Sequence, residues 1–151
     1  MAALGVLRRV QLGSYQQLCQ RAFSMVSLPE THSMLQKTCR DFAEGELAPI
    51  ASKLDKEHLF PAEQIKKLGE LGLMGINVSE DYGGSGLDSL ALSVALEEIA
   101  RGCGGTGCIV SVHNTLYANV LDQMGTKEQK DKFLTGFADG TYVGCFGLSE
   151  P

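Results

Sequence analysis

Apolar residues recur every three to five positions along most of the chain, a spacing typical of helices that bury one face. The first such run covers residues 30–56, and Pro49 inside it is expected to kink or break the helix near Ala48. A second helix is predicted to begin at Pro61, because proline suits the first helical position, and to end near Gly72. The first half of the chain is therefore expected to be helical.

The glycine-rich stretch 77–87 interrupts this pattern and is predicted to be a loop. Asp88 follows as an N-cap for a helix over 89–101. In that helix polar residues fall at every fourth position, apart from Glu98, so it should be buried on most sides. A further helix is expected over 106–123.

The C-terminal part of the sequence changes from helix to strand. Thr126 and Gln129 have the spacing of a capping box, which predicts a short helix beginning between them. After the Asp139–Gly140 turn, residues 142–148 are rich in β-formers and are predicted to be a strand. The fold class is therefore mainly α, with a first strand at the C-terminal end.

Charge is unevenly distributed along the chain. No acidic residue precedes Glu30, whereas Arg8, Arg9 and Arg21 lie among Ala, Leu, Gln and Ser. Such a composition is typical of a mitochondrial transit peptide, and the Arg21–Ser24 stretch resembles a matrix-protease site. We therefore expect cleavage near Ser24 and a matrix location; the alternative is a disordered N-terminus with chance arginines.

Composition excludes several classes of protein. The net charge of −5 has the wrong sign for a general nucleic-acid binder. The longest uncharged stretch, residues 102–121, holds too many polar residues and glycines for a transmembrane helix. The histidines are scattered and Cys103 and Cys108 have no second pair nearby, so no metal site is predicted.

A glycine cluster at residues 102–107 satisfies GxGxxG but follows a helix instead of a strand, so a dinucleotide site is not supported. These glycines are instead expected to let two helices turn sharply and pack closely. Glu97 and Glu98 diverge on their helix and cannot share one site, and Glu97 is expected to pair with Arg101. The residues alone do not name a reaction.

Three blocks of sequence stand out, in order: Cys39–Glu44 with Asp55–Pro61, Leu71–Gly75 with Tyr82–Leu87 (followed by Glu97–Arg101), and Gly144–Pro151. Together they resemble the N-terminal helical domain of the acyl-CoA dehydrogenase family. The first and third blocks are most similar to its mitochondrial short-chain members, and the second is common across the family.

The resemblance implies a fold, a cofactor and partners. Family members combine a helical N-terminal domain, a central β-domain and a C-terminal helical domain, with FAD at their junction. A carboxylate base removes an α-proton from the acyl-CoA while hydride leaves the β-carbon for the flavin, and electrons pass to electron-transfer flavoprotein. The short-chain members act on butyryl-CoA-like thioesters in fatty acid β-oxidation, as homotetramers in the mitochondrial matrix.

One cofactor-binding stretch carries over residue by residue. The family's first flavin-contacting motif matches Phe146, Gly147, Leu148, Ser149, Glu150 and Pro151. Backbone groups near Leu148 and the Ser149 hydroxyl are expected to face the N1–O2 edge of the flavin, where they would stabilise the arriving negative charge. Without the resemblance, a plain edge strand followed by a turn would explain the same residues.

The resemblance also places a substrate pocket on the helix over 106–123, at the floor of the acyl cavity. Helical spacing puts three apolar residues on one side and two others beside them. The alternative is that the apolar residues are ordinary core and that the histidine is solvated. The five candidates are Ile109, Val112, His113, Leu116 and Tyr117.

The expected organisation is a transit peptide (1–23), a helical acyl-CoA dehydrogenase domain (24–140) and the start of the central β-domain (141–151). Compared with the family, the sequence lacks the rest of the β-domain and the C-terminal domain that carries the base, so no catalytic residue is assigned and this chain alone is expected to be inactive. Within the family, the nearest alternative to a short-chain member is a branched-chain or medium-chain relative. The alternative from another class of protein is a helical mitochondrial adaptor that kept the fold without the chemistry.

Overall fold

The computed structural model describes residues 27–149. The chain divides into two units, Met1–Glu30 and Thr31–Pro151, and all helical residues described below except Glu30 belong to the second unit. The predicted leader, residues 1–23, lies outside the described residues, as do Glu150 and Pro151 of the predicted flavin-contacting stretch. No helix within 27–149 is long and apolar enough to cross a membrane.

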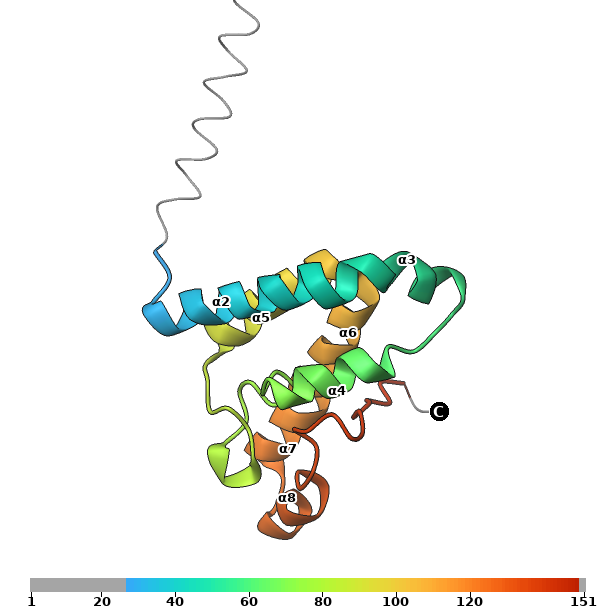
Figure 1. The fold of residues 1–151 in the computed structure, drawn as a ribbon. Coiled ribbons are helices and arrows are strands. Elements are labelled where there is room, and N and C mark those ends of the chain that lie inside the picture. The colour runs from blue at the N-terminus through green and yellow to red at the C-terminus, as the bar shows by residue number, and fades with distance from the viewer. Residues whose placement is uncertain (1–26, 150–151) are drawn as a thin grey trace, which may run out of the picture. The chain divides into compact units, whose positions relative to one another are not determined.

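The first long helical stretch contains a π-helical turn in its middle. The Ala48 N–H donates to the Ala43 carbonyl five residues back, so the backbone widens just before Pro49. Pro49 then stands at the start of the next α-helical segment, where its missing N–H costs no hydrogen bond. The interruption expected near Ala48 is thus a widened turn, and helix continues to residue 56. The segments are α2 (Glu30–Phe42), η1 (Ala43–Leu47) and α3 (Ala48–Lys56), in line in Figure 1.

The next two α-helices begin and end close to their predicted positions. α4 (Ala62–Glu70) starts directly after Pro61, and Gly72 turns the chain with a φ of 74°. In the loop that follows, η2 (Glu80–Tyr82) is a short 3-10 turn. α5 (Ser89–Gly102) is capped as predicted, because the Asp88 carboxylate accepts from the Ala91 N–H.

The glycines between α5 and the following helix allow close packing, as the sequence predicted. A Cβ on Gly102 would lie 2.8 Å from the Ala43 carbonyl oxygen, and one on Gly107 would lie 2.8 Å from the Ala100 Cβ. Larger residues there would push η1, α5 and the next helix apart. That helix is again continuous through a π-helical turn: α6 (Gly104–Val112), η3 (His113–Ala118) and α7 (Asn119–Met124).

The last helix is the short α8 (Lys127–Phe133), and both halves of the predicted capping box are present at its start. The Thr126 side chain accepts from the Gln129 N–H, while the Gln129 side chain accepts from the Thr126 N–H. Figure 1 shows α8 folded back near α7, below α4.

Two clusters of buried side chains hold the unit together. The larger cluster contains side chains from α2, η1, α4, the turn over residues 73–76, α5 and α6. The smaller cluster contains side chains from the loop at residue 78, from η3 and from the segment after α8. The larger cluster is Cys39, Phe42, Leu47, Ile65, Leu68, Leu73, Met74, Ile76, Ala91, Leu92, Ala95, Ile99 and Val110, and the smaller is Val78, Ala118, Leu134 and Phe137.

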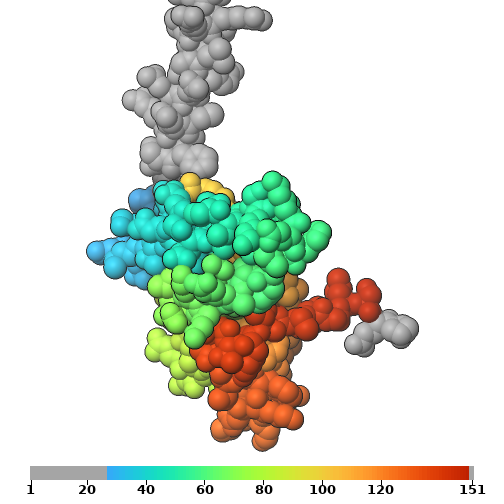
Figure 2. Space-filling view, turned by 45° about the vertical axis from the view of Figure 1, so that its right-hand side comes forward, coloured from blue at the N-terminus to red at the C-terminus, as the bar shows by residue number. Residues whose placement is uncertain are grey.

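The strand predicted over 142–148 is not formed. Within residues 27–149 there is no strand, and residues 145–149 are exposed. β-Branched and aromatic residues favour extended backbone, but a strand needs a neighbour to complete its hydrogen-bond ladder. No other described segment pairs with this one, and Figure 2 shows it projecting from the helices.

Candidate functional site

The π-helical turn η3 directs two polar side chains into the interior. Asn114 is fully buried, and its amide donates to the Leu73 and Val110 carbonyls at 3.1 and 3.0 Å. Its carbonyl oxygen accepts the Ile76 N–H at 2.9 Å. Asn114 therefore ties η3 to the turn that follows α4, and its hydrogen-bonding capacity is used by the fold.

His113, the residue before it, is also fully buried, and it contacts the C-terminal segment. Its Nδ1 accepts the Gly144 N–H at 2.9 Å. The imidazole lies between the rings of Tyr117 and Phe137, with centroids 5.7 and 5.8 Å away. Since Nδ1 is an acceptor, the ring proton is on Nε2, which is buried close to the Phe137 and Met74 backbone groups but makes no hydrogen bond of good geometry.

Burial keeps this histidine neutral. Removal from water lowers the pKa of His113 below its ordinary value, against the opposing effect of the Phe137 and Met74 backbone groups. At neutral pH the ring therefore stays an acceptor at Nδ1.

Tyr117 forms the surface on which Gly144 lies. Its hydroxyl donates to the Phe133 carbonyl at 2.7 Å, which fixes the ring between η3 and the end of α8. A Cβ on Gly144 would lie 2.0 Å from the Tyr117 Cγ, so the glycine backbone rests directly on the ring. Nearby, the Tyr142 hydroxyl donates to the Thr135 carbonyl.

The five residues of the predicted acyl pocket differ in their surroundings. His113 and Tyr117 stack together under Gly144, whereas Ile109 packs against the larger core cluster. Val112 is half-buried and Leu116 is 42% exposed. The alternative of a solvated His113 is wrong, because the π turn rotates that side chain into the interior. The pocket itself stays a prediction.

The predicted flavin-contacting stretch leaves the helices immediately after Gly144. Phe146, Gly147, Leu148 and Ser149 are all exposed, with Leu148 84% accessible. Their side chains and backbone are therefore available to a ligand or to further protein. Among the described residues, no group of three or more His, Cys, Asp or Glu side chains could hold a metal ion.

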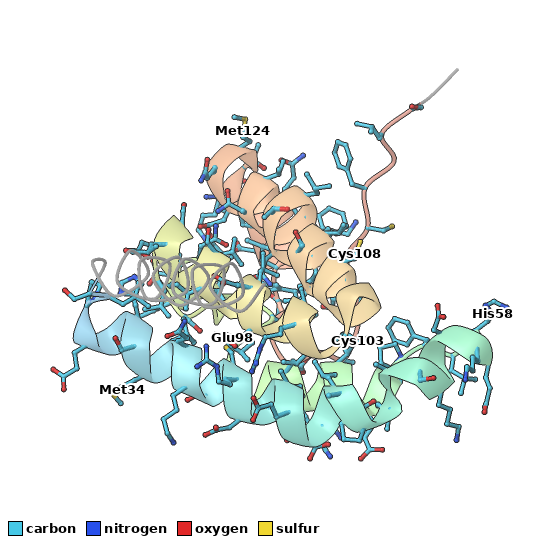
Figure 3. All side chains as sticks on the ribbon, turned by 90° about the horizontal axis from the view of Figure 1, so that it is seen from above. Met34, His58, Glu98, Cys103, Cys108 and Met124 are labelled. Atoms are coloured by element: carbon cyan, nitrogen blue, oxygen red, sulfur yellow. The ribbon has the colours of Figure 1, made fainter. Side chains whose placement is uncertain are left out.

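A charged cluster that the sequence analysis missed joins α2 to α5. Glu98 is 2% exposed. Its carboxylate accepts two hydrogen bonds from the Arg40 guanidinium, one from Nε at 3.0 Å and one from Nη2. The Arg101 Nε lies 3.2 Å from the same carboxylate, and Arg101 also pairs with Glu44 at 2.7 Å. The hydrogen bonds from Arg40 hold the pKa of Glu98 below its ordinary value. Figure 3 labels Glu98 at this crossing.

Only one sequence signal pointed to this cluster: Glu98 is the exception to the four-residue polar spacing of its helix. The predicted pair of Glu97 with Arg101 is not the one observed, since Arg101 reaches Glu98 and Glu44 instead. The cluster holds two helices together, and it contains no group placed to react with a ligand.

The chain matches a known family over most of its length. Residues 29–141 match the acyl-CoA dehydrogenase N-terminal domain. The chain therefore belongs to the acyl-CoA dehydrogenase family, as the three sequence blocks indicated.

Individual relatives agree with this assignment. The mitochondrial short-chain specific acyl-CoA dehydrogenase of Bos taurus is 59% identical over 129 residues, covering 85% of this chain and 31% of that protein. A chain in the solved structure described as the electron transferring flavoprotein of Acidaminococcus fermentans is 42% identical with a TM-score of 0.78, covering 83% of this chain and 33% of that one. The acyl-CoA dehydrogenase of Bacillus anthracis, solved in complex with FAD, is 32% identical with a TM-score of 0.76, covering 83% of this chain and 22% of that one.

These alignments also show how the lengths compare. The chain spans about a third of the bovine relative and of the Acidaminococcus chain. The similarity therefore concerns the helical domain and the segment just after it.

Proposed function

We propose that this chain is the N-terminal part of a mitochondrial flavoenzyme that dehydrogenates a short-chain acyl-CoA, such as butyryl-CoA, between its α and β carbons in fatty acid β-oxidation. The observation that carries the proposal is the match of residues 29–141 to the family domain, together with 59% identity to a short-chain specific member. The electron acceptor is proposed to be electron-transfer flavoprotein.

FAD is the proposed cofactor, and the residues present suit it. The stretch 146–149 offers exposed backbone amides and the Ser149 hydroxyl, which are hydrogen-bond donors of the kind that the electron-rich N1–O2 edge of a flavin requires. When bound, FAD would accept the hydride from the β-carbon of the substrate. The role of Leu148 and Ser149 is to orient the ring and to stabilise its added negative charge. Phe146, Gly147, Glu150 and Pro151 complete the proposed stretch.

The acyl chain is proposed to lie along the side of α6 and η3 that carries Ile109, Val112 and Leu116, near His113 and Tyr117. The partial exposure of Val112 and Leu116 supports this, because residues that limit a pocket cannot be wholly enclosed by their own domain. The proposed organisation is a leader over 1–23, the helical domain over 24–140 and the start of a β-domain over 141–151. A matrix location and a homotetramer complete the proposal.

A chimaera tests the activity. Residues 24–151 of this chain would replace the matching segment of the bovine relative, with the unaltered bovine protein as control. We expect the purified chimaera to retain FAD and to oxidise butyryl-CoA with a higher kcat/KM than an eight-carbon acyl-CoA. Ser149→Ala in the chimaera should lower kcat about tenfold or more, because one donor to the developing charge is lost.

The competing adaptor hypothesis predicts a different result for the same protein. An adaptor need only keep the helical fold, so its segment would give a folded chimaera that neither holds FAD nor turns over butyryl-CoA. A circular dichroism spectrum matching that of the bovine protein, with no flavin absorbance, would therefore reject the enzymatic proposal.

A further inference from the structure

A few contacts fix the place where the chain leaves the helical unit, and one of them is made by a fully buried side chain. Two hydrogen bonds hold residues 141 and 142 to the segment after α8. The Thr141 N–H donates to the Asp139 carboxylate, and the Tyr142 hydroxyl donates to the Thr135 carbonyl. Val143 then packs against the larger core cluster, the Gly144 N–H donates to His113 Nδ1, and every residue from 145 to 149 is exposed. Among the described residues, His113 therefore accepts the last hydrogen bond from the chain before the exposed stretch.

The imidazole is well suited to hold one position. It is completely buried, and the rings of Tyr117 and Phe137 restrict its rotation. Gly144 cannot move toward Tyr117, because its backbone already rests on a ring anchored by a hydrogen bond to Phe133. His113 Nδ1, Gly144 and the Tyr117 ring together define where the C-terminal segment leaves the helical unit.

A purely structural role does not explain why a histidine stands there. Complete burial removes the imidazole from water, and an aromatic hydrocarbon ring would fill the same space without that cost. What the histidine supplies and phenylalanine cannot is an acceptor for the Gly144 amide. Polar groups kept at a cost in stability are commonly kept for the geometry that they impose.

We propose that His113 is a positioning residue for the flavin-contacting stretch: by accepting the Gly144 N–H on Nδ1, it sets the place and direction in which residues 145–149 approach the cofactor. This inference rests on the proposed function for the identity of the cofactor. The contact that it invokes is independent of that function, because it lies within the helical unit.

The surroundings of His113 allow the contact to persist at neutral pH. Tyr117 is the titratable group stacked on it from its own element, and Phe137 packs on it from the segment after α8. Burial lowers its pKa, and no charged side chain of the described residues is among the causes of that shift. Protonation of Nδ1 would remove the acceptor, so the contact should weaken only in acid.

Hydrogen exchange followed by mass spectrometry tests the contact in the full 151-residue chain. His113→Phe keeps an aromatic ring but removes the acceptor, and we expect exchange in a peptide ending within 141–149 to accelerate at least tenfold at the Gly144 amide. Peptides of α5 and of the Asn114 partners near residue 76 should exchange as in the unaltered chain. Thr115→Val, on the same π turn, is the matched control and should change nothing near Gly144.

Two further variants keep the test decisive if the phenylalanine variant does not fold. Asn places its side-chain oxygen near the position of Nδ1, whereas Gln places its oxygen near Nε2. His113→Asn should therefore retain protection at Gly144 and His113→Gln should lose it. Equal exchange in these two variants, or unchanged exchange in a folded His113→Phe chain, would overturn the proposal.

The effect on the cofactor is measured in the chimaera. His113→Phe should weaken FAD retention or shift the flavin absorbance, and lower kcat with little change in KM, while His113→Asn should restore the flavin absorbance and kcat toward those of the unaltered chimaera. If the unaltered chimaera binds no FAD, the proposed function fails, whereas the exchange experiment still decides whether His113 positions the segment. A flavin spectrum and kcat that are the same in the Phe and Asn variants would reject a positioning role.

Discussion

The carboxylate of Glu98 shows how a single charge can be tolerated inside this helical unit. Its oxygens are enclosed, yet Arg40 and Arg101 reach it from their half-exposed positions on two helices. A buried ion that lost these partners would be strongly unfavourable, whereas a satisfied one contributes specific geometry more than stability. Glu98 therefore fixes the relative placement of α2 and α5.

Glu98→Gln should destabilise the fold. The amide keeps the shape but loses the charge-assisted hydrogen bonds, at a cost of about 1–2 kcal/mol once the solvent exposure of both arginines is allowed for. Because the pKa of Glu98 is held below its value in the unfolded chain, this stabilisation is complete near neutral pH and is lost as the pH falls through the acidic range. Urea unfolding at several pH values measures it.

Glu97→Gln is the matched control, since Glu97 is the exposed neighbour on the same helix. It should change the free energy of unfolding by less than about 0.5 kcal/mol. Equal effects of the two substitutions at neutral pH, or a Glu98 effect that grows toward acid pH, would contradict the assigned role.

At the scale of elements, the helix starts could be predicted because their causes are local. Asp88 and Thr126 satisfy N–H groups only three residues away, so the sequence pattern is sufficient. The π turns could not be predicted, because η3 is stabilised by contacts made far along the chain. Asn114 bonds to Leu73 and Ile76, 41 and 38 residues away, and the same turn rotates His113 inward. The strand predicted over 142–148 is absent for a similar reason, because a strand also needs a second segment with which to form backbone hydrogen bonds.

The face of α6 and η3 carries a prediction of its own about chain-length specificity. In the chimaera, Val112→Ala or Ile109→Ala should shift the kcat/KM preference from four-carbon toward longer acyl groups by about 1–3 kcal/mol, if one methylene-sized contact sets the limit. Initial rates with a series of acyl-CoA lengths measure the shift.

Val110→Ala provides the control on the same helix. Val110 is fully buried in the larger core cluster, so its truncation should cost about 1–3 kcal/mol of stability and leave the chain-length profile unchanged. If Val112→Ala behaves in the same way as Val110→Ala, the residue is core and the pocket assignment fails.

At the scale of the whole molecule, apolar side chains remain on the surface of the helical unit in a pattern that indicates contact with further protein. Leu116, Val120 and Met124 recur at intervals of four along η3 and α7, which places them on one face of the helix. Met124 is 82% exposed, and Figure 3 shows it at the outer end of α7. Other large exposed apolar residues are Met34, Leu59, Phe60, Leu71, Leu90, Phe133, Tyr142, Phe146 and Leu148.

The isolated 151-residue chain should therefore be helical by circular dichroism, bind a hydrophobic dye and associate as its concentration rises, because contiguous apolar surface drives association. Replacing Val120 and Met124 by Lys should lower dye fluorescence and shift the chain toward monomer in sedimentation velocity. Gln123→Lys adds a charge beside the same face without removing apolar area, so it should change both readouts far less. A monodisperse, dye-silent chain that melts cooperatively would instead favour the self-sufficient adaptor, since such a domain needs no further protein to cover these residues.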